Sequence, residues 1–110
     1  MAFKCEELKV WQRTWELTLS FPNEEIYVLT TQIKRAADSV ALNIAEGSTG
    51  QSNAEFKKFL GYALRSCIEV VACLHVGRKR ELIKQKKFKT LYDEAEEIIK
   101  MIQALRNSLK

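Results

Sequence analysis

Proline and glycine are scarce in this chain, and their scarcity argues against turn-rich folds. One proline and four glycines occur among 110 residues. An all-β domain needs many tight turns, and tight turns draw heavily on these two residues. Long helices with short connections fit better, and 110 residues suit a single domain spanning residues 1–110.

Cysteines are few, and long apolar runs are missing. Cys5, Cys67 and Cys73 show no Cys-x-x-Cys spacing. Cys67 and Cys73 stand among apolar residues, so we expect reduced, buried thiols rather than redox or metal chemistry. The first residues lack the apolar segment of a secretory signal, and no apolar run approaches the ~18 residues of a membrane span. We therefore expect a cytoplasmic protein with no membrane partner.

Catalytic and metal-binding motifs are also missing. His75 is the single histidine, and Ala72 stands three residues before it, where a di-iron bundle carries glutamate. Cys73 lies nearby, but no second pair of ligands completes a zinc site. Phosphate-binding loops, Gly-x-Ser-x-Gly and dinucleotide fingerprints do not occur. These absences predict a protein that is not an enzyme and uses no cofactor, metal or small-molecule substrate. His75 is expected to be solvated or at the edge of the core.

What the chain does contain is helical periodicity. Apolar residues recur every three or four positions in four segments, at about 6–20, 23–47, 52–80 and 85–109. Four amphipathic helices with short links predict an all-α, antiparallel up-down-up-down four-helix bundle. The expected core positions are Leu8, Trp11, Trp15, Leu19, Ile26, Leu29, Ile33, Ala37, Val40, Ile44, Phe56, Phe59, Leu60, Ala63, Cys67, Val70, Val71, Leu74, Phe88, Leu91, Ala95, Ile98, Ile102, Leu105 and Leu109.

Specific residues mark the helix ends. Gly47 stands where a left-handed residue commonly ends a helix, and Ser52 with Glu55 forms a capping box at the start of the third helix. Gly77 either ends that helix or lies within it. The first helix is much shorter than the second. We therefore expect another subunit or a partner to cover the far end of the second helix.

Positive charge is concentrated in the second half. Residues 56–110 carry 13 basic and 6 acidic residues, a net charge of +7, whereas residues 1–55 carry a net charge of −3. Such asymmetry indicates contact with nucleic acid or with an acidic surface. An ordinary solvated end is the alternative. Aromatic residues are not interleaved with these charges, which argues against a platform for single strands. The candidate nucleic-acid-binding residues are Lys57, Lys58, Arg65, Arg78, Lys79, Arg80, Lys84, Lys86 and Lys87, with Arg35 a further addition.

A second, polar stripe flanks the apolar stripe of the second helix. It contains Gln32, Arg35, Ser39, Asn43 and Glu46 and leads to Gly47. A wet interface, within the chain or between subunits, and a solvated flank both fit this pattern. Glu46 opposes the helix dipole, so we expect it to cap the third helix, with Asn43 bonded to loop backbone, or else to contact a ligand or RNA.

Two blocks of the sequence resemble a known family. The first block runs through residues 32–37, Ser39 and the segment Asn43-Ile44-Ala45-Glu46-Gly47. The second block begins at Ser52 and includes Glu55, Phe56, Phe59, Leu60, Ala63, Leu64, Ser66 and Glu69. With Val10-Trp11-Gln12, these residues resemble the bacterial family encoded in intervening sequences of 23S ribosomal RNA genes, also labelled S23 ribosomal proteins.

The resemblance implies a four-helix bundle that assembles into a homopentamer and has no enzymatic activity. It also implies kinship with accessory proteins of diversity-generating retroelements, which partner a reverse transcriptase and nucleic acid. The chain departs from the family pattern in its short first helix, at Val71 and Cys73, and at Glu81, where glycine is usual. The leading prediction is a homo-oligomeric module that binds RNA or a nucleoprotein. The alternative is a protein–protein scaffold without nucleic-acid contact.

Overall fold

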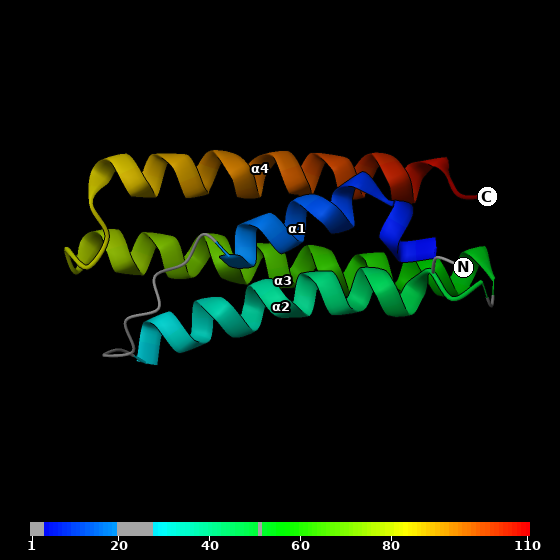
Figure 1. The fold of residues 1–110 in the computed structure, drawn as a ribbon, viewed down its shortest axis with the longest axis horizontal. Helices are drawn as coiled ribbons and strands as arrows, with labels where there is room; N and C mark the ends of the chain where they lie inside the picture. Colours follow the sequence, from blue (N-terminus) through cyan, green and yellow to red (C-terminus); the bar gives the residue numbers. More distant parts are fainter. Residues whose placement is uncertain (1–3, 20–27, 51) are drawn as a thin grey trace.

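The computed structural model describes residues 4–19, 28–50 and 52–110. Its elements are a short 3-10 helix η1 (Lys4–Glu7) and the α-helices α1 (Lys9–Leu19), α2 (Val28–Gly47), α3 (Asn53–Lys79) and α4 (Gln85–Ser108). The described residues form no strand. The prediction of an all-α four-helix bundle is therefore confirmed (Figure 1).

Helices that follow one another in the sequence also pack together. α1 contacts α2 and α4, and α3 contacts α2 and α4. Arg13 fixes α1 to α4, because its guanidinium donates to both carboxylate oxygens of Glu94, at 2.7 and 2.9 Å. The bundle is elongated, with extents of 43 × 26 × 19 Å. One end therefore carries the α3–α4 connection, and the other carries the C-terminus (Figure 1).

The predicted core is confirmed for most positions in α2, α3 and α4. Ile44, Leu60, Leu74, Ile98 and Ile102 have no exposed surface. Their spacing of three and four residues places one apolar face of each helix against its neighbours. The other buried residues of these three helices include Leu29, Ile33, Ala36, Ala37, Val40, Ala41, Phe56, Ala63, Cys67, Val70, Leu91 and Ala95. Five predicted core residues are only half-buried, at the edge of the core: Phe59, Val71, Phe88, Leu105 and Leu109.

The prediction for the first helix was partly wrong. Val10 and Thr14 are its buried residues among those described, whereas Leu8 and Trp11 are half-buried. Thr14 can be buried because its hydroxyl donates to the carbonyl of Val10 at 2.7 Å. The side chains at 15–19 and residue 26 lie outside the part of the chain that the structure describes.

Glu81 occupies the position after α3 where glycine is usual, and the backbone hydrogen bonds at the end of this helix hold it there. Glu81 adopts a left-handed backbone with φ of 60°. Its amide donates to the carbonyl of Arg78, and the Leu82 amide donates to Gly77 at 2.9 Å. This pair of bonds is the Schellman motif, which usually has glycine at the position of Glu81. Gly77 therefore lies within α3 rather than ending it, and its missing side chain leaves room for Ile83, which would lie 2.6 Å from an added Cβ.

The link between α2 and α3 confirms one part of the capping prediction. The Ser52 hydroxyl accepts the Glu55 amide at 3.1 Å, but the Glu55 carboxylate lies 3.8 Å from Lys58 instead of reaching back to Ser52. Gly47 ends α2, as predicted. The left-handed glycine is Gly50, however, with φ of 88°. Gly47 serves close packing instead, because a Cβ there would lie 2.7 Å from Phe59 Cβ.

The far end of α2 is covered by the chain itself. η1 contacts α2, and Ile44, Gly47 and Ser48 are buried there. The chain itself therefore covers the inner side of this end. That another subunit or a partner covers the rest of it stays a prediction. The outer side of this end, at Leu42 and Glu46, is exposed.

The expectation that no segment could span a membrane needs correction. α3 is long and apolar enough by length and composition, with a mean hydropathy of 1.5 over an 18-residue window. Here it packs between α2 and α4. Since the core helix of a bundle meets the same criteria, this property says little about a membrane.

Candidate nucleic-acid interface

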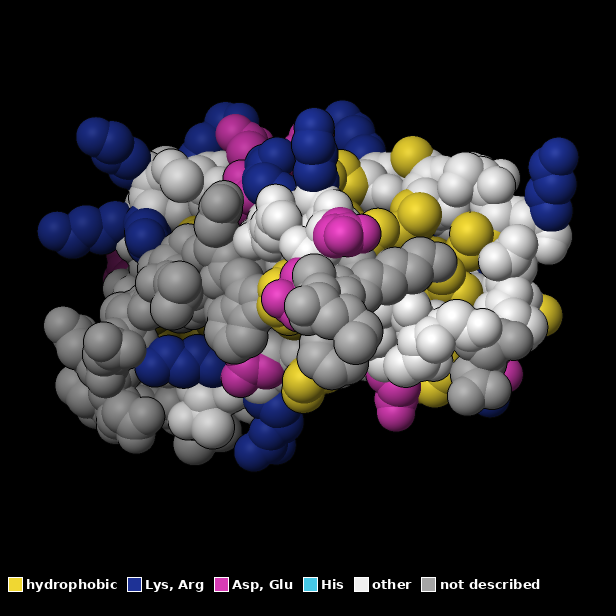
Figure 2. Space-filling view, turned by 45° about the vertical axis from the view of Figure 1, so that its right-hand side comes forward, with side chains coloured by type: hydrophobic (Ala, Val, Ile, Leu, Met, Phe, Trp, Pro, Cys, Tyr) yellow, Lys and Arg dark blue, Asp and Glu magenta, His cyan; other side chains and the backbone are white. Residues whose placement is uncertain are grey.

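Six basic residues gather where α3 ends and α4 begins. Five of the six are exposed, and Arg78 is half-buried. We name this surface the basic end; its members are Arg78, Lys79, Arg80, Lys84, Lys86 and Lys87. Lys and Arg side chains project from this end of the molecule in Figure 2. The connection of residues 80–84 is short, so charges from both helices lie within one small region.

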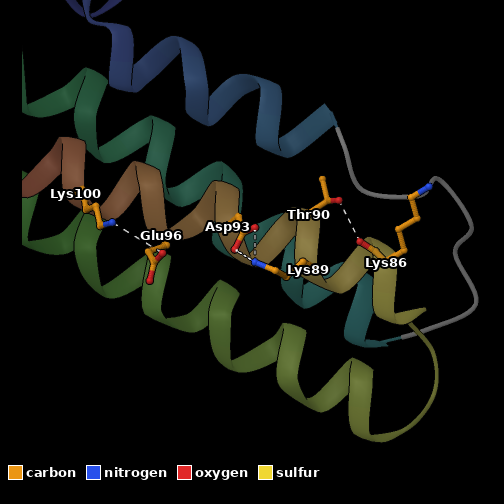
Figure 3. Close-up of polar contacts among 6 residues, drawn as sticks. All are labelled: Lys86, Lys89, Thr90, Asp93, Glu96 and Lys100. Carbon is orange, nitrogen blue, oxygen red and sulfur yellow. Dashed lines mark hydrogen bonds and ion pairs between the residues drawn. The ribbon is translucent and has the colours of Figure 1, made fainter.

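Few interactions inside the chain neutralise the basic end. Within the part of the chain that the structure describes, none of the six residues forms an ion pair. Arg78 is positioned by Gln85, whose side-chain oxygen accepts from its Nε at 2.8 Å. Further along α4, Lys89 pairs with Asp93 at 2.8 Å, and Lys100 lies 4.0 Å from Glu96. Figure 3 shows the Lys86 amine pointing away from these pairs.

The start of α4 adds positive potential to the same region. Helix N-termini carry a partial positive charge, which acidic first-turn residues usually offset. α4 has no acidic residue in its first turn, and its N-cap, Lys84, makes no side-chain capping bond. This arrangement costs stability in the free protein, because like charges are held together. An anion at this surface would relieve the repulsion.

The structure separates the other predicted basic residues from this cluster. Lys57 and Lys58 lie near the start of α3, whereas Arg78 lies near its end. Arg78 follows Lys58 by 20 positions, which corresponds to about 30 Å along a helix. Arg65 lies between them and is exposed. The nine predicted residues therefore form no single patch. The six residues of the basic end are the largest group among them that lies close together.

The polar stripe of α2 divides into an inner and an outer part. Ser39 is half-buried and accepts from the Ser66 hydroxyl of α3 at 2.9 Å. Asn43 donates to the Ser39 carbonyl at 2.8 Å, so the prediction that it bonds loop backbone was wrong. Glu46 is exposed and does not cap α3, whose N-cap is Ser52. Gln32 and Arg35 are exposed as well.

Residues of both parts of this stripe border an open hollow of about 660 Å³ along α2. Leu42 lies in this hollow with 68% of its surface exposed, the largest exposure among the large apolar side chains that the structure describes. The residues lining the hollow are Thr31, Lys34, Arg35, Asp38, Ser39, Leu42, Asn43 and Glu46. Charges of both signs surround one exposed leucine.

An aromatic cluster beside the basic end was missed in the sequence. His75 of α3 lies with its ring centroid 5.2 Å from that of Phe88 and 5.8 Å from that of Tyr92, both in α4. His75 is exposed, as one of the predicted alternatives required. The prediction that no aromatic residues are interleaved with the basic residues was wrong, because these three rings lie next to the α3–α4 connection. The spacing of Phe88 and Tyr92, one helical turn apart, could have indicated the pair.

Cys67 and Cys73 of α3 lie in the core and at its edge, respectively. Cys67 is buried, and burial raises its pKa from 9.0 to about 12. Cys73 is half-buried, and burial followed by the charge of Glu69 raises its pKa. Burial of Cys67 agrees with the prediction of a packed thiol. In the described ranges, no group of three or more His, Cys, Asp or Glu side chains is arranged to hold a metal ion.

The fold and this surface together define a class: small helical bundles with a charged end and no recognisable catalytic motif. A family model, described as 23S rRNA-intervening sequence protein, matches residues 6–104. The chain therefore belongs to this family, and the resemblance inferred from its two sequence blocks is confirmed.

One solved structure extends this comparison. It is a protein of unknown function from the S23 ribosomal protein family of Bacteroides thetaiotaomicron. The two chains are 25% identical, the match covers 88% of this chain and 97% of that one, and the TM-score is 0.80. No curated protein matches this chain. Neither the family description nor the description of this neighbour states an enzymatic activity.

Proposed function

We propose that this protein is a non-enzymatic, cytoplasmic, homo-oligomeric module that binds the phosphate backbone of RNA through its basic end. The observation that carries the proposal is the group of six basic side chains without ion-pair partners in the described residues. Cations held together in this way bind phosphates by releasing counterions, with no need to read sequence. An assembly of several copies would multiply this surface and raise the affinity by avidity.

The proposal predicts a steep dependence of RNA binding on salt. The measurement is fluorescence anisotropy with a labelled RNA hairpin at salt concentrations from about 50 to 200 mM. If one chain engages about six phosphates, its affinity falls about 10³-fold over this range. Lys86→Glu with Lys87→Glu is expected to lower the affinity and to reduce the slope of log affinity against log salt by about 2.

Lys110→Glu provides the matched control for this charge reversal. Lys110 is exposed at the end of the chain, far from the α3–α4 connection (Figure 1). Its reversal is expected to change binding much less than reversal of Lys86 and Lys87. Lys110→Glu changes the net charge by two units and the double variant changes it by four, so an effect of Lys110→Glu at least half as large would show that net charge, rather than the basic end, governs binding. No binding at the lowest salt would refute the proposal.

A second candidate function is a protein–protein scaffold, and Leu42 favours it. A leucine that is 68% exposed among polar residues is typical of an interface with an apolar centre. Arg35, Asp38 and Glu46 surround it in the same hollow, and a partner could pair with them.

For Leu42→Asp, we expect an unchanged fold and a lower native mass, because a charge would then stand at the centre of the subunit contact. Native mass spectrometry measures the assembly, and circular dichroism verifies the helices. Thr31→Asp is the control, because it places the same charge in the same hollow but 11 positions before Leu42 in α2. It is expected to lower the native mass less than Leu42→Asp does. An unchanged mass for Leu42→Asp would exclude this face as the subunit contact.

A further inference from the structure

The aromatic cluster joins two helices at the solvent edge of the bundle. We use this name for His75, Phe88 and Tyr92. The Phe88 and Tyr92 rings are stacked, with centroids 5.7 Å apart and an interplanar angle of 29°. The His75 ring meets both edge-on, at interplanar angles of 63° and 80°. Three rings of two helices therefore form one contiguous aromatic surface.

This cluster is only partly used by the core. Phe88 packs against the buried core residues, but Tyr92 is half-buried and His75 is exposed. Core packing accounts for one of the three rings. The other two extend the aromatic surface outward, where a planar ligand can reach them.

The charges around the cluster favour an anionic ligand. Lys79 follows His75 by one helical turn, about 6 Å along the axis, and Lys84 precedes Phe88 by the same distance. Neither lysine forms an ion pair with a described residue. The acidic neighbours on α4 are already paired: Asp93 with Lys89, and Glu96 with Lys100 (Figure 3). Glu81 is a further exposed acidic residue, in the α3–α4 connection, but the six residues of the basic end outnumber it. The net charge beside the rings is therefore positive.

We infer that the aromatic cluster stacks an unpaired base of a single-stranded RNA segment whose phosphates lie on the basic end. The inference rests on the proposed function and specifies its substrate class. Aromatic rings next to cations are the usual means of holding single strands, because every base offers a face for stacking while phosphates follow the charges. A duplex keeps its bases stacked on one another, so it cannot use the cluster.

The experiment compares three labelled probes by fluorescence anisotropy. They are an oligoadenylate of about 12 nucleotides, within the 4–16 nucleotides typical of single-strand sites, an abasic strand of the same length, and a duplex RNA. For Tyr92→Ala, the affinity for oligoadenylate is expected to fall about five- to hundredfold. Affinities for the abasic strand and the duplex are expected to stay unchanged. Tyr92→Phe keeps the ring and is expected to bind like the wild type.

Two further variants distinguish a loss of base stacking from a loss of the fold. His75→Ala changes an exposed side chain and is expected to weaken oligoadenylate binding selectively as well. Tyr62→Ala removes an exposed tyrosine of α3, which contacts Phe59 edge-on at 5.6 Å. Tyr62 lies about 20 Å along the helix from His75, so its removal is expected to leave all three affinities unchanged.

The outcomes separate this inference from the proposed function. Equal binding of oligoadenylate and the abasic strand, or an equal loss for all probes in Tyr92→Ala, would overturn base stacking and leave backbone binding standing. A lower native mass for Tyr92→Ala with unchanged RNA binding would show a protein contact instead, and would also overturn it. If no probe binds at low salt, both proposals fail.

Discussion

Replacing Gly47 with alanine is expected to destabilise the bundle, although alanine normally favours helices. The added Cβ would lie 2.7 Å from Phe59 Cβ and 3.0 Å from Phe56 Cδ1. Phe59 Cβ is fixed to the backbone of α3, so relief requires the two helices to move apart. Overpacking of this kind costs about 1–3 kcal/mol. The expected result is a lower midpoint of urea unfolding with an unchanged slope.

Gly61→Ala is the matched control, with the opposite expected sign. Gly61 lies inside α3, and its nearest neighbour is a guanidinium nitrogen of Arg106 at 3.6 Å, an ordinary contact. Alanine there gains about 1 kcal/mol of helix propensity without a clash. The two variants should thus differ in the free energy of unfolding by about 2–4 kcal/mol. If both stabilise, the close approach of α2 and α3 at Gly47 is not a constraint.

The periodic parts of the fold could be predicted from the sequence because their signals are local and redundant. Ile33, Val40 and Ile44 repeat at helical spacing, and each supports the same face of α2. The Ser52 cap rests on one residue and its neighbours, so it was also predictable. By contrast, Thr14 is buried through a bond to its own helix, and an apolar pattern cannot reveal a buried threonine.

Features that depend on contacts between distant segments could not be predicted from the sequence. Glu81 holds a left-handed backbone only because the bonds of the α3 end and the packing of Ile83 on Gly77 determine it. His75 meets Tyr92 because α3 and α4 pack at one particular register, which the spacing within either helix does not specify. The periodicity of apolar residues predicts which face of each helix is buried. It does not predict which residues of two packed helices contact each other.

Above pH 9, Cys67 is expected to make the protein markedly less stable. Burial raises the pKa of its thiol from 9.0 to about 12. In the unfolded chain the thiol ionises near its ordinary value, while the folded state keeps its proton to much higher pH. The resulting stability is therefore fully present below about pH 9 and is lost as pH rises toward about 12, by about 1.4 kcal/mol per pH unit.

Comparison with Cys67→Ala isolates this effect, because lysine and tyrosine side chains ionise over the same range in both proteins. Cys73 also has a raised pKa, with the same sign in both, so it cancels in the difference. At neutral pH the wild type is expected to be more stable, since alanine leaves a small cavity in a fully buried site. At pH 10.5 the wild type should have lost about 2 kcal/mol relative to the variant. Urea unfolding at both pH values measures the difference, and parallel losses in the two proteins would show that Cys67 ionises in the folded state as readily as in the unfolded chain.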